Sequence, residues 1–528
     1  MKSRSQSSQV YEHLNKSWKD ACKILLKEEV GNLNEYEGWL SEWLEPSRMR
    51  KSPSGEDVLT VGDYCDSASF VPFSGIDLMK KYPPLSINEI KDIDSILSAT
   101  QERIYYAGNI VLGKSSNVEE STGIEDCNFA LRSHSCNSSQ DIAFCTQMRE
   151  DRSLFGCVMC GESSFTIKCY GNWRTARSLL SSTIHESSDI YFSHKLTGCS
   201  ECMFSFNLRA KHHAIGNTPL PSEKYLPLKQ KLLSELAEEL RKKKRLPNLV
   251  DFFPPQPSKP STPKTIPLPR KNEDFELIED AFHTTSELLL GKNTLHLKPL
   301  SNYLSRHVRA IQKLPSCVSG KDVFRCSTRF DDVVSKCGRM VRLDEYDSVS
   351  HPQELPHGME KLSLSGITPL ISPVAYYCPE AAEQFENAIE CNDIYSAYHC
   401  YRASKVYFTK FTAFSYWARN CEYTFGCDSL RTSSFCIQCH NSFKLSRCFE
   451  VDTSQDCTGS YFLHNCENVH DSMFCFNTKN KRYAIGNSEV GKENFLKAKS
   501  ALQAWLLSQL ERSGSVELDI YNIGCRKP

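Results

Sequence analysis

Cysteines recur at a strict nine-residue spacing in this chain, and that spacing limits the folds open to it. The longest run is Cys439, Cys448, Cys457, Cys466 and Cys475. A helix turns about 100° per residue, so nine residues end half a turn out of phase and share no helical face. A strict short period is instead typical of stacked repeats. We therefore predict a parallel β-solenoid (a right-handed β-helix) with cysteines stacked inside it.

The length of one coil is less well determined. Residues three and four places after each cysteine of the run alternate in type, as Ser442, Val451, Ser460 and Val469 do. This alternation favours a coil of about 18 residues built from two similar nine-residue halves. Small, polarisable cysteines suit the narrow core of such a coil.

The chain also contains an internal duplication. Residues 150–217 align with 420–487 at a constant shift of 270, and 22 of the 68 positions are identical. Segments upstream align at a shift of 264. We therefore interpret the whole chain as two tandem copies of one unit, which form a fused pseudo-dimer. The fold predicted is mainly β with helices: two solenoids with N- and C-terminal helices as caps or packing partners.

The expected boundaries follow from these patterns. The first copy is 1–246, with a helical segment at about 1–60, a solenoid at about 120–217 and a helix at 222–245. A proline-rich linker, 247–271, is expected to be an extended, semi-rigid spacer. The second copy is 272–528, with a helical segment at 272–310, a solenoid at about 385–487 and a helix at 489–512.

The repeat region resembles a known group of sequences. The step Phe425-Gly426-Cys427, the nine-residue cysteines and the ending from Asn477 to Asn487 resemble uncharacterised cysteine-rich repeat proteins of microbial and viral genomes. Ala214 and Ala484 stand where those proteins usually have cysteine. The resemblance covers about 90 residues in each copy; it implies a β-solenoid and no established activity.

Composition excludes several classes of function. The net charge is −1, and no apolar stretch is long enough to cross a membrane. The sequence has neither of the common glycine-rich phosphate motifs, and no pair of carboxylates recurs as a glycosidase would need. The polar N-terminus lacks the apolar core of a secretory signal. We therefore expect no enzyme, no cofactor, a cytoplasmic location and free, mostly buried thiols among the 25 cysteines.

Metal binding is the first alternative to weigh. Cys157-x-x-Cys160 and Cys199-x-x-Cys202 have the spacing of zinc ligands. The second copy does not keep these pairs, because Leu430, Val469 and Ser472 replace Cys160, Cys199 and Cys202. We therefore expect no metal site, and the four cysteines remain outside candidates.

The leading hypothesis is a non-enzymatic interaction or scaffold protein with a protein partner or a place in a large assembly. Residues shared by both copies are the candidate binding residues: Tyr191, His194, Asn207 and Lys211, with Tyr461, His464, Asn477 and Lys481. An RNA- or ribosome-associated role is the alternative, with the basic cluster Arg241, Lys242, Lys243, Lys244 and Arg245 as contacts. A metal or redox protein is the second alternative.

Overall fold

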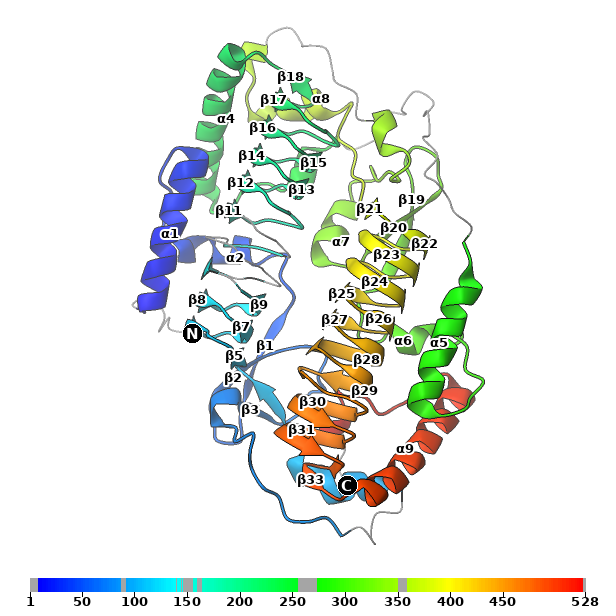
Figure 1. Cartoon of the computed structure of the whole chain (residues 1–528). Coiled ribbons are helices and arrows are strands. Elements are labelled where there is room, and N and C mark those ends of the chain that lie inside the picture. The colour runs from blue at the N-terminus through cyan, green and yellow to red at the C-terminus, as the bar shows by residue number, and fades with distance from the viewer. Residues whose placement is uncertain are drawn as a thin grey trace.

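The computed structural model describes residues 8–86, 92–138, 140–143, 145, 155–158, 164–254, 273–349 and 359–525. Two ladders of short parallel strands lie side by side, one in each half of the chain, with helices along their outer flanks (Figure 1). The fold is thus mixed α and β with mostly parallel strands, and nine α-helices lie in the described part of the chain.

The strands of the first ladder are β5 (Val111–Leu112), β6 (Ser116–Glu119), β7 (Thr122–Glu125), β8 (Asn128–Leu131), β9 (His134–Asn137), β10 (Gln140–Ile142), β11 (Ser164–Ile167), β12 (Ala176–Leu179), β13 (Ser182–His185), β14 (Ser188–Tyr191), β15 (His194–Thr197), β16 (Ser200–Met203) and β17 (His212–Ile215). Those of the second ladder are β21 (Ala382–Glu383), β22 (Glu386–Ile389), β23 (Ile394–Tyr401), β24 (Val406–Ala413), β25 (Tyr416–Arg419), β26 (Glu422–Phe425), β27 (Asp428–Arg431), β28 (Ser434–Phe443), β29 (Ser446–Asp452), β30 (Tyr461–His470), β31 (Met473–Arg482) and β32 (Ala484–Ile485). Antiparallel β18 (Thr218–Pro219) and β33 (Ser488–Glu489) follow the two ladders.

The register of the strands corrects the predicted period. Paired residues are twelve apart throughout the second ladder, as for Cys436 with Cys448 and Leu463 with Cys475. The first ladder has the same step, apart from thirteen residues between β5 and β7. The expected period of nine or 18 residues was therefore wrong: each turn of the backbone takes twelve residues.

A three-residue pattern within the turn explains why cysteines recur every nine residues. From Gln384 to Gly486, every third residue has a positive φ, so a turn of twelve residues has four such corners. Cysteines follow the corners directly and point inward, where all but the half-buried Cys391 are buried. Nine residues are one turn of twelve residues less one triplet of three. A cysteine nine residues after another therefore lies on the next turn of the backbone, one corner before the position that pairs with the first cysteine. The Cys466 thiol accordingly donates to the carbonyl of Cys475 (3.2 Å).

The core of the second ladder is narrow. Buried Cys, Ala, Val and Leu fill it, which agrees with the prediction that small side chains stack inside. Strands β24 and β28 each span more than one edge of the turn. Their pairings with β25, β26 and β27 therefore close into a circuit of five parallel strands.

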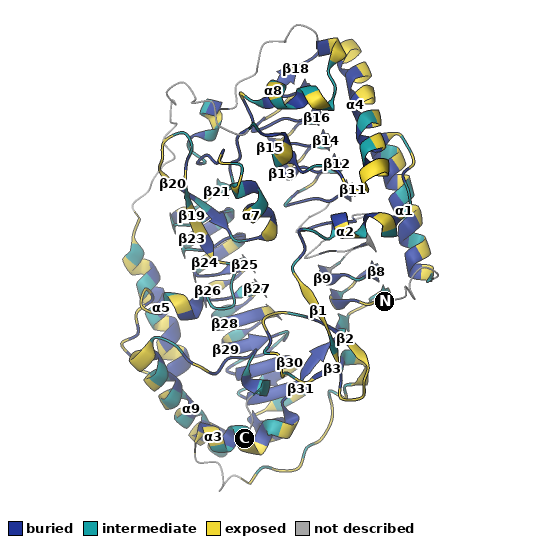
Figure 2. Cartoon of the chain, turned by 180° about the vertical axis from the view of Figure 1, so that it is seen from behind, coloured by how far each residue is buried: buried dark blue, intermediate teal, exposed yellow. Residues whose placement is uncertain are grey.

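The longer helices flank the ladders and do not cap their ends, which corrects the prediction of capping helices. The α-helices are α1 (Gln9–Leu26), α2 (Glu37–Leu40), α3 (Ile93–Thr100), α4 (Ser222–Lys243), α5 (Phe275–Leu290), α6 (Ser301–Leu304), α7 (Arg329–Ser335), α8 (Ile367–Ile371) and α9 (Lys492–Ser513). Helices α1 and α5 contact several successive strands, and α4 and α9 pack against them. Their apolar faces are buried toward the strands, whereas their outer faces are exposed (Figure 2).

Three small strand pairs precede the ladders. They are antiparallel β1 (Ser47–Lys51) with β2 (Asp57–Val61), antiparallel β19 (Ile311–Pro315) with β20 (Asp322–Cys326), and parallel β3 (Phe70–Pro72) with β4 (Tyr106–Gly108). At the start of the expected linker, the 3-10 helix Leu249–Phe252 packs onto the first ladder, where Phe252 contacts Phe192 and Phe204. Residues 255–271 of that linker lie outside the described residues.

Each half supplies the segment that covers the end of the other half's ladder. Gly486 ends the second ladder with a φ of 52°, and a Cβ there would collide with Thr100 of α3. Arg103 donates to the Gly486 carbonyl at 2.7 Å. Gly216 ends the first ladder with a φ of 58°, against Leu370 of α8. The shared Ala-Ile-Gly-Asn ending thus provides a glycine at a place where a segment of the opposite half lies close to the backbone.

Candidate functional site

The histidines common to both halves lie buried between the two ladders. His194 extends from β15 and His464 from β30, and neither is exposed. The main-chain N–H of Cys378 donates to His194 Nε2 (3.2 Å), and that of Ala107 donates to His464 Nε2 (3.0 Å). Each histidine therefore binds the backbone of the opposite half.

The shared asparagines repeat this exchange. Asn207 donates to the carbonyl of Tyr376 (3.3 Å), and Asn477 donates to the carbonyl of Tyr105 (2.6 Å). Both asparagines are buried. We call these two histidines and two asparagines the reciprocal seam, because every one of them contacts the other half of the chain.

A carboxylate completes the seam beside His464. Asp452 Oδ2 lies 2.9 Å from His464 Nδ1, and Tyr64, Tyr521 and Asn441 also donate to this carboxylate. Burial raises the pKa of Asp452, but the hydrogen bonds from His464, Asn441 and Tyr64 outweigh it and lower the pKa to about 2. At the matching place in the first half, Ser182 bonds to His194 Nδ1 (2.9 Å).

The Asp452–His464 pair resembles a catalytic dyad, but its geometry opposes that role. A general base needs a free ring nitrogen facing the proton that it removes. Nε2 of His464 already accepts from Ala107, and Nδ1 faces Asp452. Burial lowers the pKa of His194 to about 3, so this second histidine stays neutral at pH 7. Both histidines are therefore used as hydrogen-bond partners within the fold.

The shared aromatic residues are also buried. Tyr191 lies below the ammonium of Lys229 from α4, 5.0 Å from the ring centre. Tyr461 donates to the carbonyl of Leu289 in α5 (2.6 Å). Lys211 is exposed and Lys481 is half-buried, and both lie outside the reciprocal seam.

The basic cluster lies at the end of α4, and its five side chains are exposed but paired. Arg241, Lys244 and Arg245 contact Glu28, Glu35 and Glu42 from the α1–α2 region, and Lys242 and Lys243 contact Glu238 and Glu239 one helical turn back. Exposed ion pairs contribute little stability each. Together they neutralise much of the field that an RNA partner would need.

The described cysteines of these pairs belong to no cluster suited to a metal. In the described part of the chain, no three His, Cys, Asp or Glu side chains are placed to hold an ion. Cys157 is buried, and Cys160 lies outside the described residues. Cys199 and Cys202 are buried on adjacent edges of one turn, and their thiols donate to the main-chain carbonyls of Leu208 (3.6 Å) and Lys211 (3.7 Å).

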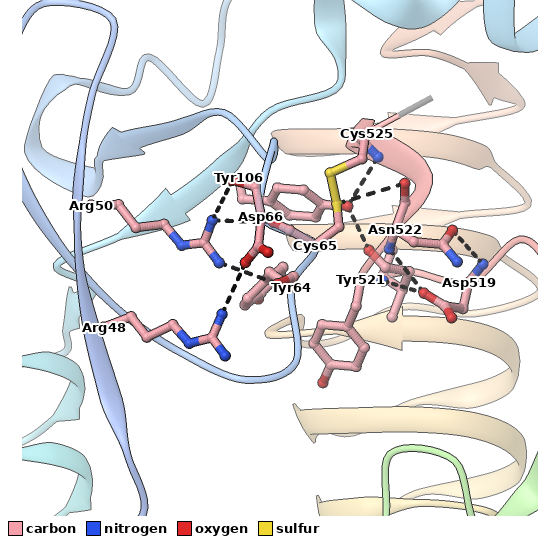
Figure 3. The surroundings of a disulfide bond; sticks show 12 residues. Arg48, Arg50, Tyr64, Cys65, Asp66, Tyr106, Asp519, Tyr521, Asn522 and Cys525 are labelled. Carbon is pink, nitrogen blue, oxygen red and sulfur yellow. Dashed lines mark hydrogen bonds and ion pairs between the residues drawn. A yellow bond between two sulfur atoms is a disulfide. The ribbon is translucent and has the colours of Figure 1, made fainter. Parts of the chain in front are cut away.

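Sequence reasoning missed a disulfide between distant residues. Cys65 and Cys525 are bonded although 460 residues separate them, so the expectation of free thiols is wrong for this pair (Figure 3). The other 22 cysteines of the described residues form no disulfide with one another. The bond lies beside Tyr64, Tyr106 and Tyr521 and ties the C-terminal segment 516–525 to the loop after β2. No local signal connects two cysteines so far apart.

The C-terminal segment covers a second group of titratable side chains. Burial would lower the pKa of His307, but its hydrogen bond to Asp519 (3.2 Å) and its ion pair with Asp63 (3.6 Å) outweigh it and raise the pKa to about 9. Burial raises the pKa of Glu450 to about 8 and lowers that of His440 to about 3. Both ring nitrogens of His440 lack a hydrogen-bond partner among the described residues.

Comparisons with family models, curated proteins and solved structures found no match. The site must therefore be interpreted from its own chemistry. No helix among the described residues is long and apolar enough to cross a bilayer.

Proposed function

We propose that this chain is a non-enzymatic scaffold or interaction protein, in which a duplicated unit forms two β-solenoids fused as a pseudo-dimer. The constant twelve-residue register and the buried inward cysteines support the solenoid interpretation. The matched contacts of His194 and His464 support the duplication, since the two histidines bind opposite halves in the same way.

The reciprocal seam is the observation that carries this proposal. The polar side chains common to both halves are buried and bonded to the opposite backbone, so they fix the two ladders against each other. Protein partners would then bind residues on the outward-facing side of the ladders. Tyr398 and Phe408 are 36% and 47% exposed on neighbouring strands there, with exposed Lys410 close by in sequence. Exposed aromatic side chains are enriched at protein interfaces.

Size-exclusion chromatography of native lysate, followed by cross-linking, tests the proposal. We expect the chain to elute with a stoichiometric protein partner and cross-links to form near Tyr398. The double substitution Tyr398→Ser/Phe408→Ser should release the partner, whereas Leu277→Ser on the exposed face of α5 should not. Elution of the chain alone, without cross-links, would contradict the proposal.

A cytoplasmic location is part of the same proposal. The 22 cysteines that form no disulfide with one another among the described residues support a reducing compartment. The Cys65–Cys525 bond weighs against one. Determining the thiol state of these two cysteines in intact cells, with rapid alkylation, distinguishes the two cases.

A further inference from the structure

Five basic side chains gather at the end of the second ladder, near β31 and β33 (Figure 1). They come from two segments in contact, because the Leu78 carbonyl accepts from the main-chain N–H of Lys479 (3.1 Å) and from the hydroxyl of Thr478 (3.4 Å). Within the described part of the chain, none of the five forms an ion pair with a carboxylate. We call them the terminal basic patch: Lys80, Lys81, Lys479, Lys481 and Arg482.

The positive charge of this patch is accessible and little neutralised. Lys80, Lys81 and Arg482 are exposed, and the other two side chains are half-buried. Buried Arg103 adds a further charge, since its hydrogen bonds go to the neutral carbonyls of Gly486 and Pro83 and to the Ser488 hydroxyl. Like charges that gather without partners repel one another and oppose folding. The patch therefore calls for an anionic ligand.

The first half of the chain has no equivalent of this patch among its described residues. At the shift of 264 residues, Lys80 and Lys81 align with Asp344 and Glu345. Asp344 pairs with Arg342 (2.8 Å), and Glu345 accepts from the main-chain N–H of Arg342 (3.1 Å). The duplicated fold thus forms with acidic residues at these positions. The two lysines are not needed to build it.

The neighbours of the lysines favour a protein ligand over a nucleic acid. Met79 is 54% exposed beside them, and exposed methionine is enriched at protein interfaces. The Lys80 ammonium and the Arg103 guanidinium each lie 5.0 Å from the centre of the Tyr82 ring. They contact the aromatic surface on which a base would stack. The net charge of −1 also gives the chain no long-range attraction for a polyanion.

We propose that the terminal basic patch binds an acidic segment of a protein partner. Carboxylates of that segment pair with the lysines and Arg482, and an apolar side chain between them contacts Met79. The proposal rests on the proposed function in taking the partner to be a protein. It assigns a second contact surface, because Tyr398 and Phe408 lie on β23 and β24, near the other end of the same ladder.

Fluorescence anisotropy of the full chain with a short labelled peptide rich in Glu and Leu tests this surface. We expect binding that weakens as salt is added, because exposed charges are screened. The same peptide with Gln in place of Glu should not bind. Lys80→Glu/Lys81→Glu should weaken binding of the acidic peptide at least about 10-fold through like-charge repulsion.

A matched control lies at the end of α4. Lys242 and Lys243 are also adjacent, exposed lysines, but each is paired with a glutamate one helical turn back. Lys242→Glu/Lys243→Glu changes the net charge equally and should weaken peptide binding by less than about 2-fold, since the contact is local. Equal losses in the two variants, or an acidic peptide that binds no better than its Gln form, would overturn the proposal.

Two further results separate the alternatives. Tighter binding of an oligouridylate of the same charge than of the peptide would overturn the proposal in favour of a nucleic-acid surface. In native lysate, a partner that Tyr398→Ser/Phe408→Ser releases and Lys80→Glu/Lys81→Glu retains would contradict this inference and leave the proposed function standing. The peptide measurements on the unmodified protein decide the proposal even if a variant does not fold.

Discussion

The main-chain N–H of Ala107 and the Nε2 atom of His464 are 3.0 Å apart, although 357 residues separate them in the sequence. His194 accepts from Cys378 in the same way in the opposite direction. The two hydrogen bonds identify the seam as a structural feature that both halves build together.

Replacing His464 with alanine should destabilise the protein. The substitution removes the hydrogen-bond acceptor of the Ala107 N–H and one hydrogen-bond partner of the Asp452 carboxylate. Both groups are buried, so water does not replace the lost partner. We expect a loss of about 2–4 kcal/mol in the free energy of unfolding, measured by urea denaturation. His194→Ala should lose a similar amount, whereas exposed His212→Ala should change it by less than about 0.5 kcal/mol. Equal effects at all three positions would contradict this view of the seam.

Three buried histidines should make the fold sensitive to acid. Burial lowers the pKa of His194 and His440 to about 3 and that of His134 to about 4. An unfolded histidine titrates near ~6.5, so below that pH the unfolded chain binds protons that the native chain does not. Stability should therefore fall as pH drops below about 6.5, by up to ~1.4 kcal/mol per pH unit for each histidine. Urea denaturation at pH 7, 6 and 5 measures this slope.

His440→Leu is the matched variant for the acid response. It replaces a buried ring whose nitrogens find no partner in the described structure with an apolar side chain. We expect it to be neutral or stabilising at pH 7 and to reduce the slope below pH 6.5. An unchanged slope would mean that His440 does not contribute to it.

The Cys65–Cys525 bond should hold the C-terminal segment in place. It closes a very long loop, which favours a sizeable effect on the unfolded chain. Cys65→Ser/Cys525→Ser should cost about 2–4 kcal/mol and speed hydrogen exchange in residues 516–525. A reductant should reproduce the change in the unmodified protein and add nothing to the variant. Slow exchange in the reduced protein would show that buried Leu518 and Ile520 suffice.

The sequence predicted the elements better than their connections. Matching residues in the two copies, such as His194 and His464, were predicted to bind a partner, but both are buried and accept from the backbone of the opposite half. Their burial was not foreseen, because a single sequence does not show which outward side chain faces another ladder. The twelve-residue turn was hidden because inward positions occur every third residue and cysteine occupies only some of them. The contact of Cys65 with Cys525 depends on how the whole chain folds, and no local pattern encodes it.

Cutting the chain between its halves should not separate them. A protease recognition sequence inserted near residue 263 allows cleavage in the proline-rich segment between the halves. With reductant present, so that Cys65 and Cys525 no longer link the fragments, we expect both fragments to co-elute at micromolar concentration. The expected cause is the exchange of covering segments, in which Arg103 binds Gly486 and α8 lies against Gly216.

The same experiment tests what holds the fragments together. If the seam and the exchanged segments carry the association, His194→Ala/His464→Ala should make the cleaved fragments dissociate at higher concentration than the unmodified ones do. Half-buried Lys481→Ala should leave their association unchanged, because this side chain lies outside the seam. Fragments that separate at once after cleavage would mean that each half completes its own ladder in solution. Persistent association, lost only in the histidine variant, would establish the seam as the joint between the halves.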